Sequence, residues 1–133
     1  MERLVYVSEA SDNTGTQDVF AIVEASARNN ATLDLTGFLL FEDNRFLQLL
    51  EGPSGNIDMI MAQIRHDPRH HSLHIAERRD AIERWFPNWK MKQLISFNSP
   101  PAMEELRVIL KSKEGGERVQ AILDDFLKVR PAN

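Results

Sequence analysis

The stretch LTGFLLFEDNRFLQLL, residues 35–50, decides the fold because it has the pattern of two strands joined by a tight turn. Leu35–Phe41 and Phe46–Leu50 are mainly apolar, and the four residues between them are EDNR. Asp and Asn tolerate the positive φ of a tight turn, so the stretch predicts a β-hairpin. Side chains alternate along a strand, so positions 46, 48 and 50 share one face. Gln48 is therefore a polar residue within an apolar set.

Strand and helix signals precede this hairpin. Arg3–Ser8, RLVYVS, is a short run typical of a strand. Thr14–Gln17 offers a capping box that opens a helix, and its apolar stripe begins at Val19 and ends at Asn30 on the same face. Small residues near the end of that stripe leave room for a groove, and the amides of Asn29 and Asn30 at its mouth suit a flat polar edge.

The pattern continues after the hairpin. Ser54 is the expected N-cap of a second helix, which Asp67-Pro68 stops. Residues 69–71 are expected to form a loop, and Leu73–Ala76 a strand. A turn at residues 86–88 then leads into a last strand, Trp89–Phe97, in which residues 89, 91 and 93 share one side.

The segment after the last strand differs in kind. Asn98–Pro101 is the first break in composition that indicates a boundary, and Pro100 suits the first position of a helix that runs to about Lys113. Gly115-Gly116 interrupts it, and an apolar stripe over 119–127 marks another helix. We expect these two amphipathic helices to cap the sheet or to bind a partner.

The order of elements predicts an α+β domain with ferredoxin-like layering. We expect a mixed β-sheet of about five strands with two helices on one face, followed by the two C-terminal helices. Residues 1–97 form the main domain in this interpretation, and residues 98–133 form a helical extension of the same compact unit. This order of elements defines no function.

The composition favours one domain that acts without nucleic acid or membrane. The chain has 133 residues, a formal net charge of −4 and no cysteine. Its 16 basic residues are spread along the chain, so nucleic-acid binding is not expected. Without cysteine, disulfides and thiolate chemistry are excluded, and neither a signal peptide nor a membrane span is recognisable. We therefore expect a cytoplasmic protein.

Two internal polar residues, Tyr6 and Gln48, are the candidates for a function within the sheet. A buried Tyr often only bonds to a carbonyl, and a Gln in a strand often lies at an edge, so spacing alone leaves a structural role open. Six separated segments then resemble the BLUF family in order over residues 3 to 93. They are RLVYVS at 3–8, RNN at 28–30, TGFLLF at 36–41, FLQLLEGP at 46–53, DPRH at 67–70 and WKM at 89–91.

The resemblance implies a flavin held between the two helices. By position, Asn30 would bond to the pyrimidine edge of the ring, with Asn29 assisting. The remaining contacts carried over are apolar residues against the ring (Ile22, Ile64 and Phe46) and polar residues at the ribityl end (Asp67, Arg69 and His70). Gln63 stands where family members often have a basic residue, which weakens the grip on a phosphate. The expected cofactor is FAD, with FMN or riboflavin as alternatives.

The resemblance also implies a blue-light photoreceptor that is not an enzyme. Tyr6, the only tyrosine, would donate an electron and a proton to the excited flavin, and Gln48 would then flip or tautomerise and red-shift the flavin absorption. Trp89 and Met91 compete for the place beside Gln48 as the signal relay. Nothing after Asn98 is long enough for a cyclase or phosphodiesterase, so we expect a separate partner protein and a homo-oligomer.

Three alternatives stay open at this stage. One is an acylphosphatase-type hydrolase or small-ligand-binding domain in which Arg69, His70 and Asn30 form an anion site. Another is a metal site from the four His residues, at positions 66, 70, 71 and 74, although Pro68 interrupts the helix between two of them. The last is an interaction module in which the sheet is only a scaffold.

Overall fold

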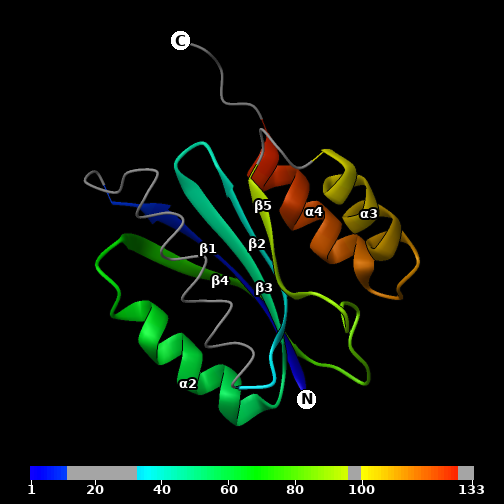
Figure 1. Cartoon of the computed structure of the whole chain (residues 1–133), viewed down its shortest axis with the longest axis horizontal. Coiled ribbons are helices and arrows are strands. Elements are labelled where there is room, and N and C mark those ends of the chain that lie inside the picture. Colours follow the sequence, from blue (N-terminus) through cyan, green and yellow to red (C-terminus); the bar gives the residue numbers. More distant parts are fainter. Residues whose placement is uncertain (12–32, 96–99, 129–133) are drawn as a thin grey trace.

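A computed structural model describes residues 1–11, 33–95 and 100–128, and its centre is one five-stranded sheet (Figure 1). The strands lie in the order β4-β1-β3-β2-β5. The β1–β3, β1–β4 and β2–β3 pairs are antiparallel, and β2–β5 is parallel. The predicted mixed sheet is confirmed. Its strands are β1 (Glu2–Ala10), β2 (Thr36–Glu42), β3 (Arg45–Gly52), β4 (His70–Asp80) and β5 (Lys90–Ile95).

The predicted hairpin joins β2 to β3. Its turn residues Asp43 and Asn44 have φ angles of 53° and 60°, the left-handed conformation that the sequence led us to expect. At the far end of β2, Gly37 has a φ of 142°, and a Cβ there would lie 1.9 Å from the carbonyl oxygen of Leu49. Only glycine fits this close approach of the two strands.

One sheet face is covered by α2 (Ser54–Arg65), and we call it the α2 face. Apolar side chains of the helix, Ile57, Ile60 and Met61, pack against it. The predicted cap was wrong by one residue, because Pro53 occupies the N-cap and its carbonyl accepts the first helical bonds from residues 56 and 57. The helix predicted before the hairpin lies outside the described residues. The α2 face carries Leu4, Tyr6, Ala10, Leu39, Phe46 and Leu50.

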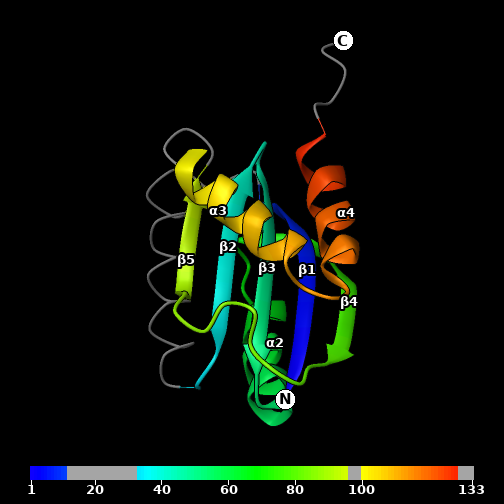
Figure 2. The ribbon, with the colours of Figure 1, turned by 90° about the vertical axis from the view of Figure 1, so that its right-hand side faces the viewer.

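The opposite face is covered by α3 (Pro100–Lys111) and α4 (Gly116–Leu127), and we call it the cap face (Figure 2). The predicted apolar stripe of the last helix forms its contact with the sheet, as Val119, Leu123 and Phe126 are buried there. The two C-terminal helices therefore cap the sheet, which is one of the two roles that we expected for them. The cap face carries Val5, Phe38, Leu40, Leu47 and Leu49.

Two boundaries differ from the sequence-based prediction. β4 is longer than expected and begins at His70, so residues 70 and 71 belong to a strand and not to a loop. β5 begins at Lys90, so Trp89 precedes the strand and does not share its alternation. Among the residues described, no helix has both the length and the apolar character needed to cross a membrane.

Candidate functional site

A buried hydrogen bond joins Tyr6 to Gln48 across the centre of the sheet. The two residues are directly opposite in the β1–β3 ladder, and their side chains point to the α2 face. Tyr6 Oη donates to Gln48 Oε1 over 2.5 Å, with 4% and 1% of the two residues exposed. A phenol and a carboxamide are thus isolated from water in an otherwise apolar layer.

The Tyr6 phenol is held in its protonated form. Burial raises the pKa of Tyr6 well above its ordinary value, and the negative charge of Asp67 adds to the rise. The phenol therefore keeps its proton at every physiological pH. A carboxamide offers an acceptor and two donors on one pivoting group, so Gln48 can exchange one for the other by turning.

His70 closes the site next to this pair. Its ring lies 6.5 Å from that of Tyr6 and 6.1 Å from that of Phe46, centroid to centroid. Its Nε2 is 2.7 Å from the carbonyl oxygen of Ile64, and its Nδ1 is 2.9 Å from Ser8 Oγ. A carbonyl only accepts, so Nε2 carries the proton, and in the neutral ring Nδ1 accepts from the serine. Both nitrogens serve to join α2 to β1, which argues against the hydrolase hypothesis.

Asp67 and Arg69 form an ion pair at the end of α2. The guanidinium donates to both carboxylate oxygens, with Nη2 2.7 Å from Oδ2 and Nε 2.9 Å from Oδ1. These bonds lower the pKa of Asp67 from its ordinary value. Gln63 is exposed on α2, while Ile64 is half-buried against the α2 face. The chain thus brings Ile64 and His70 to the same face of the sheet as Tyr6.

The other predicted site residues are placed differently or are not described. Ile22, Asn29 and Asn30 lie outside the described residues, as does the side chain of Met91. Trp89, which was expected to compete for the place beside Gln48, packs on the cap face, because it precedes β5. Its ring lies 4.9 Å from that of Phe86 and 6.2 Å from that of Phe38, centroid to centroid.

The His-based metal hypothesis finds no support in residues 1–11, 33–95 and 100–128. This part of the chain contains no group of three or more His, Asp or Glu side chains that could hold a metal ion. Of the four His residues, His70 uses its ring nitrogens within the protein, as described above.

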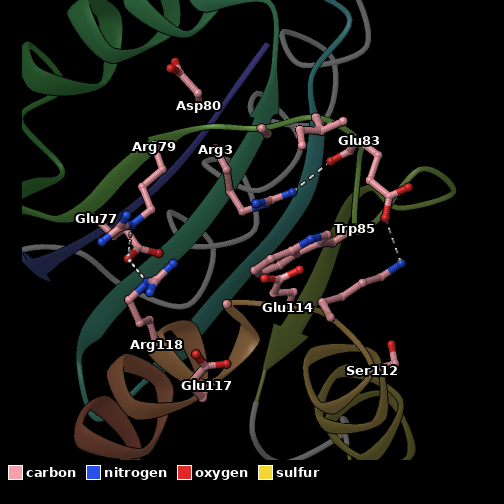
Figure 3. Close-up of a pocket in the computed structure, with 14 residues that line it drawn as sticks. Arg3, Glu77, Arg79, Asp80, Glu83, Trp85, Ser112, Glu114, Glu117 and Arg118 are labelled. Atoms are coloured by element: carbon pink, nitrogen blue, oxygen red, sulfur yellow. Dashed lines mark hydrogen bonds and ion pairs between the residues drawn. The ribbon is translucent and has the colours of Figure 1, made fainter.

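Sequence reasoning missed the role of Glu51, which is fully buried on β3. Its carboxylate accepts from the backbone N–H groups of Trp85 and Phe86, at 2.9 and 2.6 Å, and from Arg3 Nε at 3.1 Å. Arg3 also lies over the Trp85 ring and donates to the carbonyl of Glu83 (Figure 3). The network fixes the connection between β4 and β5. A charged residue in an apolar strand was the available signal.

The fold and this pair of residues define a small α+β domain with a buried phenol–carboxamide pair, and the family comparison identifies it. Residues 1–92 match the family described as "BLUF: Sensors of blue-light using FAD". The chain belongs to the BLUF family, and flavin binding is a property of that family.

Known proteins similar to this chain share its domain but differ in length. A photoactivated adenylate cyclase subunit beta from Euglena longa is 33% identical over 115 residues, which are 82% of this chain and 13% of the relative. The blue light- and temperature-regulated antirepressor BluF of Escherichia coli (strain K12) is 39% identical over 70 residues, which cover 53% of this chain and 17% of the length of BluF. The dark-state structure of BlrB, a BLUF protein, matches with a TM-score of 0.70 and 27% identity over 90% of this chain and 95% of that one.

Proposed function

We propose that this protein is a blue-light photoreceptor in which Tyr6 and Gln48 form the switch. The observation that carries this proposal is their buried hydrogen bond of 2.5 Å at the centre of the sheet. The pair satisfies its hydrogen bond within an apolar layer, and the match of residues 1–92 to the BLUF family supports a functional role for it.

The described residues fit a flavin. A phenol–carboxamide pair suits the polar edge of a flat heteroaromatic ring, and Phe46 and Ile64 supply apolar surface beside it. Ile22, Asn29 and Asn30 would complete the site from the chain segment before the hairpin. When bound, the flavin absorbs blue light and becomes able to accept an electron from a nearby donor. FAD is our proposal, with FMN or riboflavin as alternatives.

The chain's own part in the switch is a movement of one proton and one amide. As it loses an electron to the excited flavin, Tyr6 would pass its Oη proton to Gln48 Oε1, and Gln48 Nε2 would give up one of its own protons in exchange. Tyr6 would recover a proton when the electron returns. Gln48 turns or tautomerises during this exchange, and its acceptor and donor atoms change places relative to the phenol. Burial favours the neutral phenol, so the proton returns to Tyr6 while Gln48 stays in its changed form, and the resting pair is restored only later, in the dark.

The signal leaves residues 1–97 through the C-terminal helices in this proposal. Residues 98–133 act as the output segment, whose packing on the sheet or on another subunit changes with light. We propose that the chain itself catalyses no reaction and acts on a separate signalling protein, as a homo-oligomer. Trp89 packs on the cap face, away from Gln48, so Met91 remains the proposed relay residue. A cytoplasmic location stays a prediction from the sequence.

One absorption experiment tests the function. The purified protein, loaded with FAD, is expected to show a red-shifted flavin band after blue illumination, which decays in the dark. Gln48→Leu is expected to bind the flavin without showing the shift. Gln120→Leu makes the same change from amide to alkyl on α4, where the side chain bonds to Asp124, and this matched control should retain the shift. A colourless protein that takes up no flavin would favour the scaffold alternative, and a full shift in Gln48→Leu would end the switching mechanism.

A further inference from the structure

Arg45 connects the strand of the proposed switch to the last turn of α4. It is the first residue of β3, three positions before Gln48, and its side chain points to the cap face. Nη2 donates to the carbonyl oxygen of Phe126 over 2.5 Å, and the guanidinium carbon lies 4.5 Å from the centroid of the Phe126 ring. One side chain thus holds both the backbone and the ring of the same helical residue.

The contact supplies a positive charge and a hydrogen-bond donor at the C-terminal end of α4. The last carbonyls of a helix have no partner within the helix, and they carry the negative end of its dipole. The last turn of α4 contains no basic residue of its own. Arg45 provides a positive charge and a donor from the sheet, next to Phe126, which is 2% exposed and anchors α4 in the core. The end of the helix therefore depends on where β3 places this arginine.

The same strand carries the switch. In the β1–β3 ladder, Tyr6 faces Gln48 and Glu9 faces Arg45, three pairs further along. This separation is about 10 Å along the strand. Phe46 lies between them in the chain, and its ring packs on the α2 face 6.1 Å from the His70 ring. A turn of Gln48 or a shift of Phe46 changes a backbone that Arg45 shares.

Other polar contacts between the sheet layer and the C-terminal helices start elsewhere and are weaker. Arg118 at the start of α4 pairs with Glu77 of β4 over 3.3 Å, in the groove of Figure 3. Lys113 lies 3.7 Å from Glu83, whose side chain is 70% exposed. The Arg118 side chain is 48% exposed, and ion pairs with an exposed partner contribute little, because water and salt screen them. Neither contact involves β3.

We propose that Arg45 is a positioning residue that transmits the state of Gln48 to the C-terminal end of α4. The inference rests on the proposed photoreceptor function and adds a route that leaves through β3, independent of Trp89 and Met91. Arg45 Nε is buried without a hydrogen-bond partner among the residues described here. The guanidinium is therefore held by one carbonyl and one ring, an attachment that a small movement of β3 can loosen.

The experiment compares hydrogen exchange of α4 in the dark and under blue light, in the full FAD-loaded protein. In the unaltered protein, light should change exchange of the amides around Phe126 by about fivefold or more, the low end of ordinary coupling between sites. Arg45→Met keeps the length of the side chain and removes charge and donor. We expect it to retain the flavin red shift, since Arg45 and Gln48 lie on opposite faces, and to lose the light-dependent change in α4.

Arg107→Met is the matched control, because it removes an exposed α3–α4 ion pair with Asp124 and leaves β3 untouched. It should keep both the red shift and the response of α4. If Arg45→Met does not bind flavin, Arg45→Lys replaces it; this variant keeps the charge and should retain the response. A full response in Arg45→Met, or its loss in Arg45→Lys with a normal red shift, overturns the role of Arg45. Absence of a red shift in the unaltered protein overturns the photoreceptor function itself.

Discussion

Replacing Glu51 by Gln should destabilise the protein far more than its small change in shape suggests. Oε2 accepts from Trp85 N–H and Arg3 Nε, and Oε1 accepts from Phe86 N–H and Thr36 Oγ1. A carboxamide has one acceptor oxygen, so its NH₂ group must face at least one buried backbone N–H. An unsatisfied buried donor costs about 1–3 kcal/mol, and breaking a buried ion pair costs about 3–5 kcal/mol.

The two costs overlap, because Arg3 keeps its bond to the Glu83 carbonyl and its place over the Trp85 ring. We therefore expect Glu51→Gln to lower the free energy of unfolding by about 4 kcal/mol, a large part of the total of about 5–15 kcal/mol for such domains. With a urea m-value of about 1.5 kcal/mol/M, the unfolding midpoint should fall by about 2 to 3 M.

Urea titration of the flavin-loaded protein, followed by circular dichroism, measures this shift. Glu83→Gln makes the same chemical change at a side chain that is 70% exposed and 3.7 Å from Lys113, and it should move the free energy by less than about 1 kcal/mol. If the two variants unfold at similar urea concentrations, the Glu51 network does not hold the β4–β5 connection as argued.

Three further outcomes follow from other sites. Tyr6→Phe should bind flavin, show no light-induced red shift, and lose about 1–3 kcal/mol because its buried hydrogen bond to Gln48 is lost; a normal shift in this variant would refute the donor role. Gly37→Ala should cost about 4 kcal/mol or more in a thermal melt, since its Cβ would lie 1.9 Å from the Leu49 carbonyl oxygen, and a near-normal melting temperature would contradict the close approach. The lowered pKa of Asp67 means that its ion pair stabilises the fold above about pH 4 and that this contribution is lost as the pH falls through the folded pKa. Asp67→Asn should flatten the acid limb of the melting temperature, and an unchanged limb would count against the pair.

The sequence predicted those parts of the fold that depend on local chemistry. Asp43 and Asn44 produced the hairpin turn, and the stripe through Val119 and Leu123 placed the last helix on the sheet. The extent of β4 was missed because it is an edge strand covered only in part, so its side chains lack a strong apolar alternation. Trp89 was misplaced because the strand it was assigned to begins one residue later.

In the candidate site, too, local sequence patterns predicted some residues and missed others. Tyr6 and Gln48 were recognised because each is a polar residue among apolar neighbours in a strand, and the ladder then placed them opposite each other. The partners of Glu51 and Arg45 lie 15 to 81 residues away along the chain. No local pattern contains such contacts, because they exist only after the C-terminal helices and the β4–β5 connection have packed.

Because side chains alternate along β3, this one strand contacts two separate layers of the molecule. Even-numbered positions from 46 to 50 face α2, where we propose that the flavin binds, and odd-numbered positions from 45 to 51 face α3 and α4. A library that varies each position in turn should therefore sort by the parity of the residue number. Substitutions at even positions would alter the flavin absorption and its response to light, whereas substitutions at odd positions would alter the response of the C-terminal helices while the absorption stays the same.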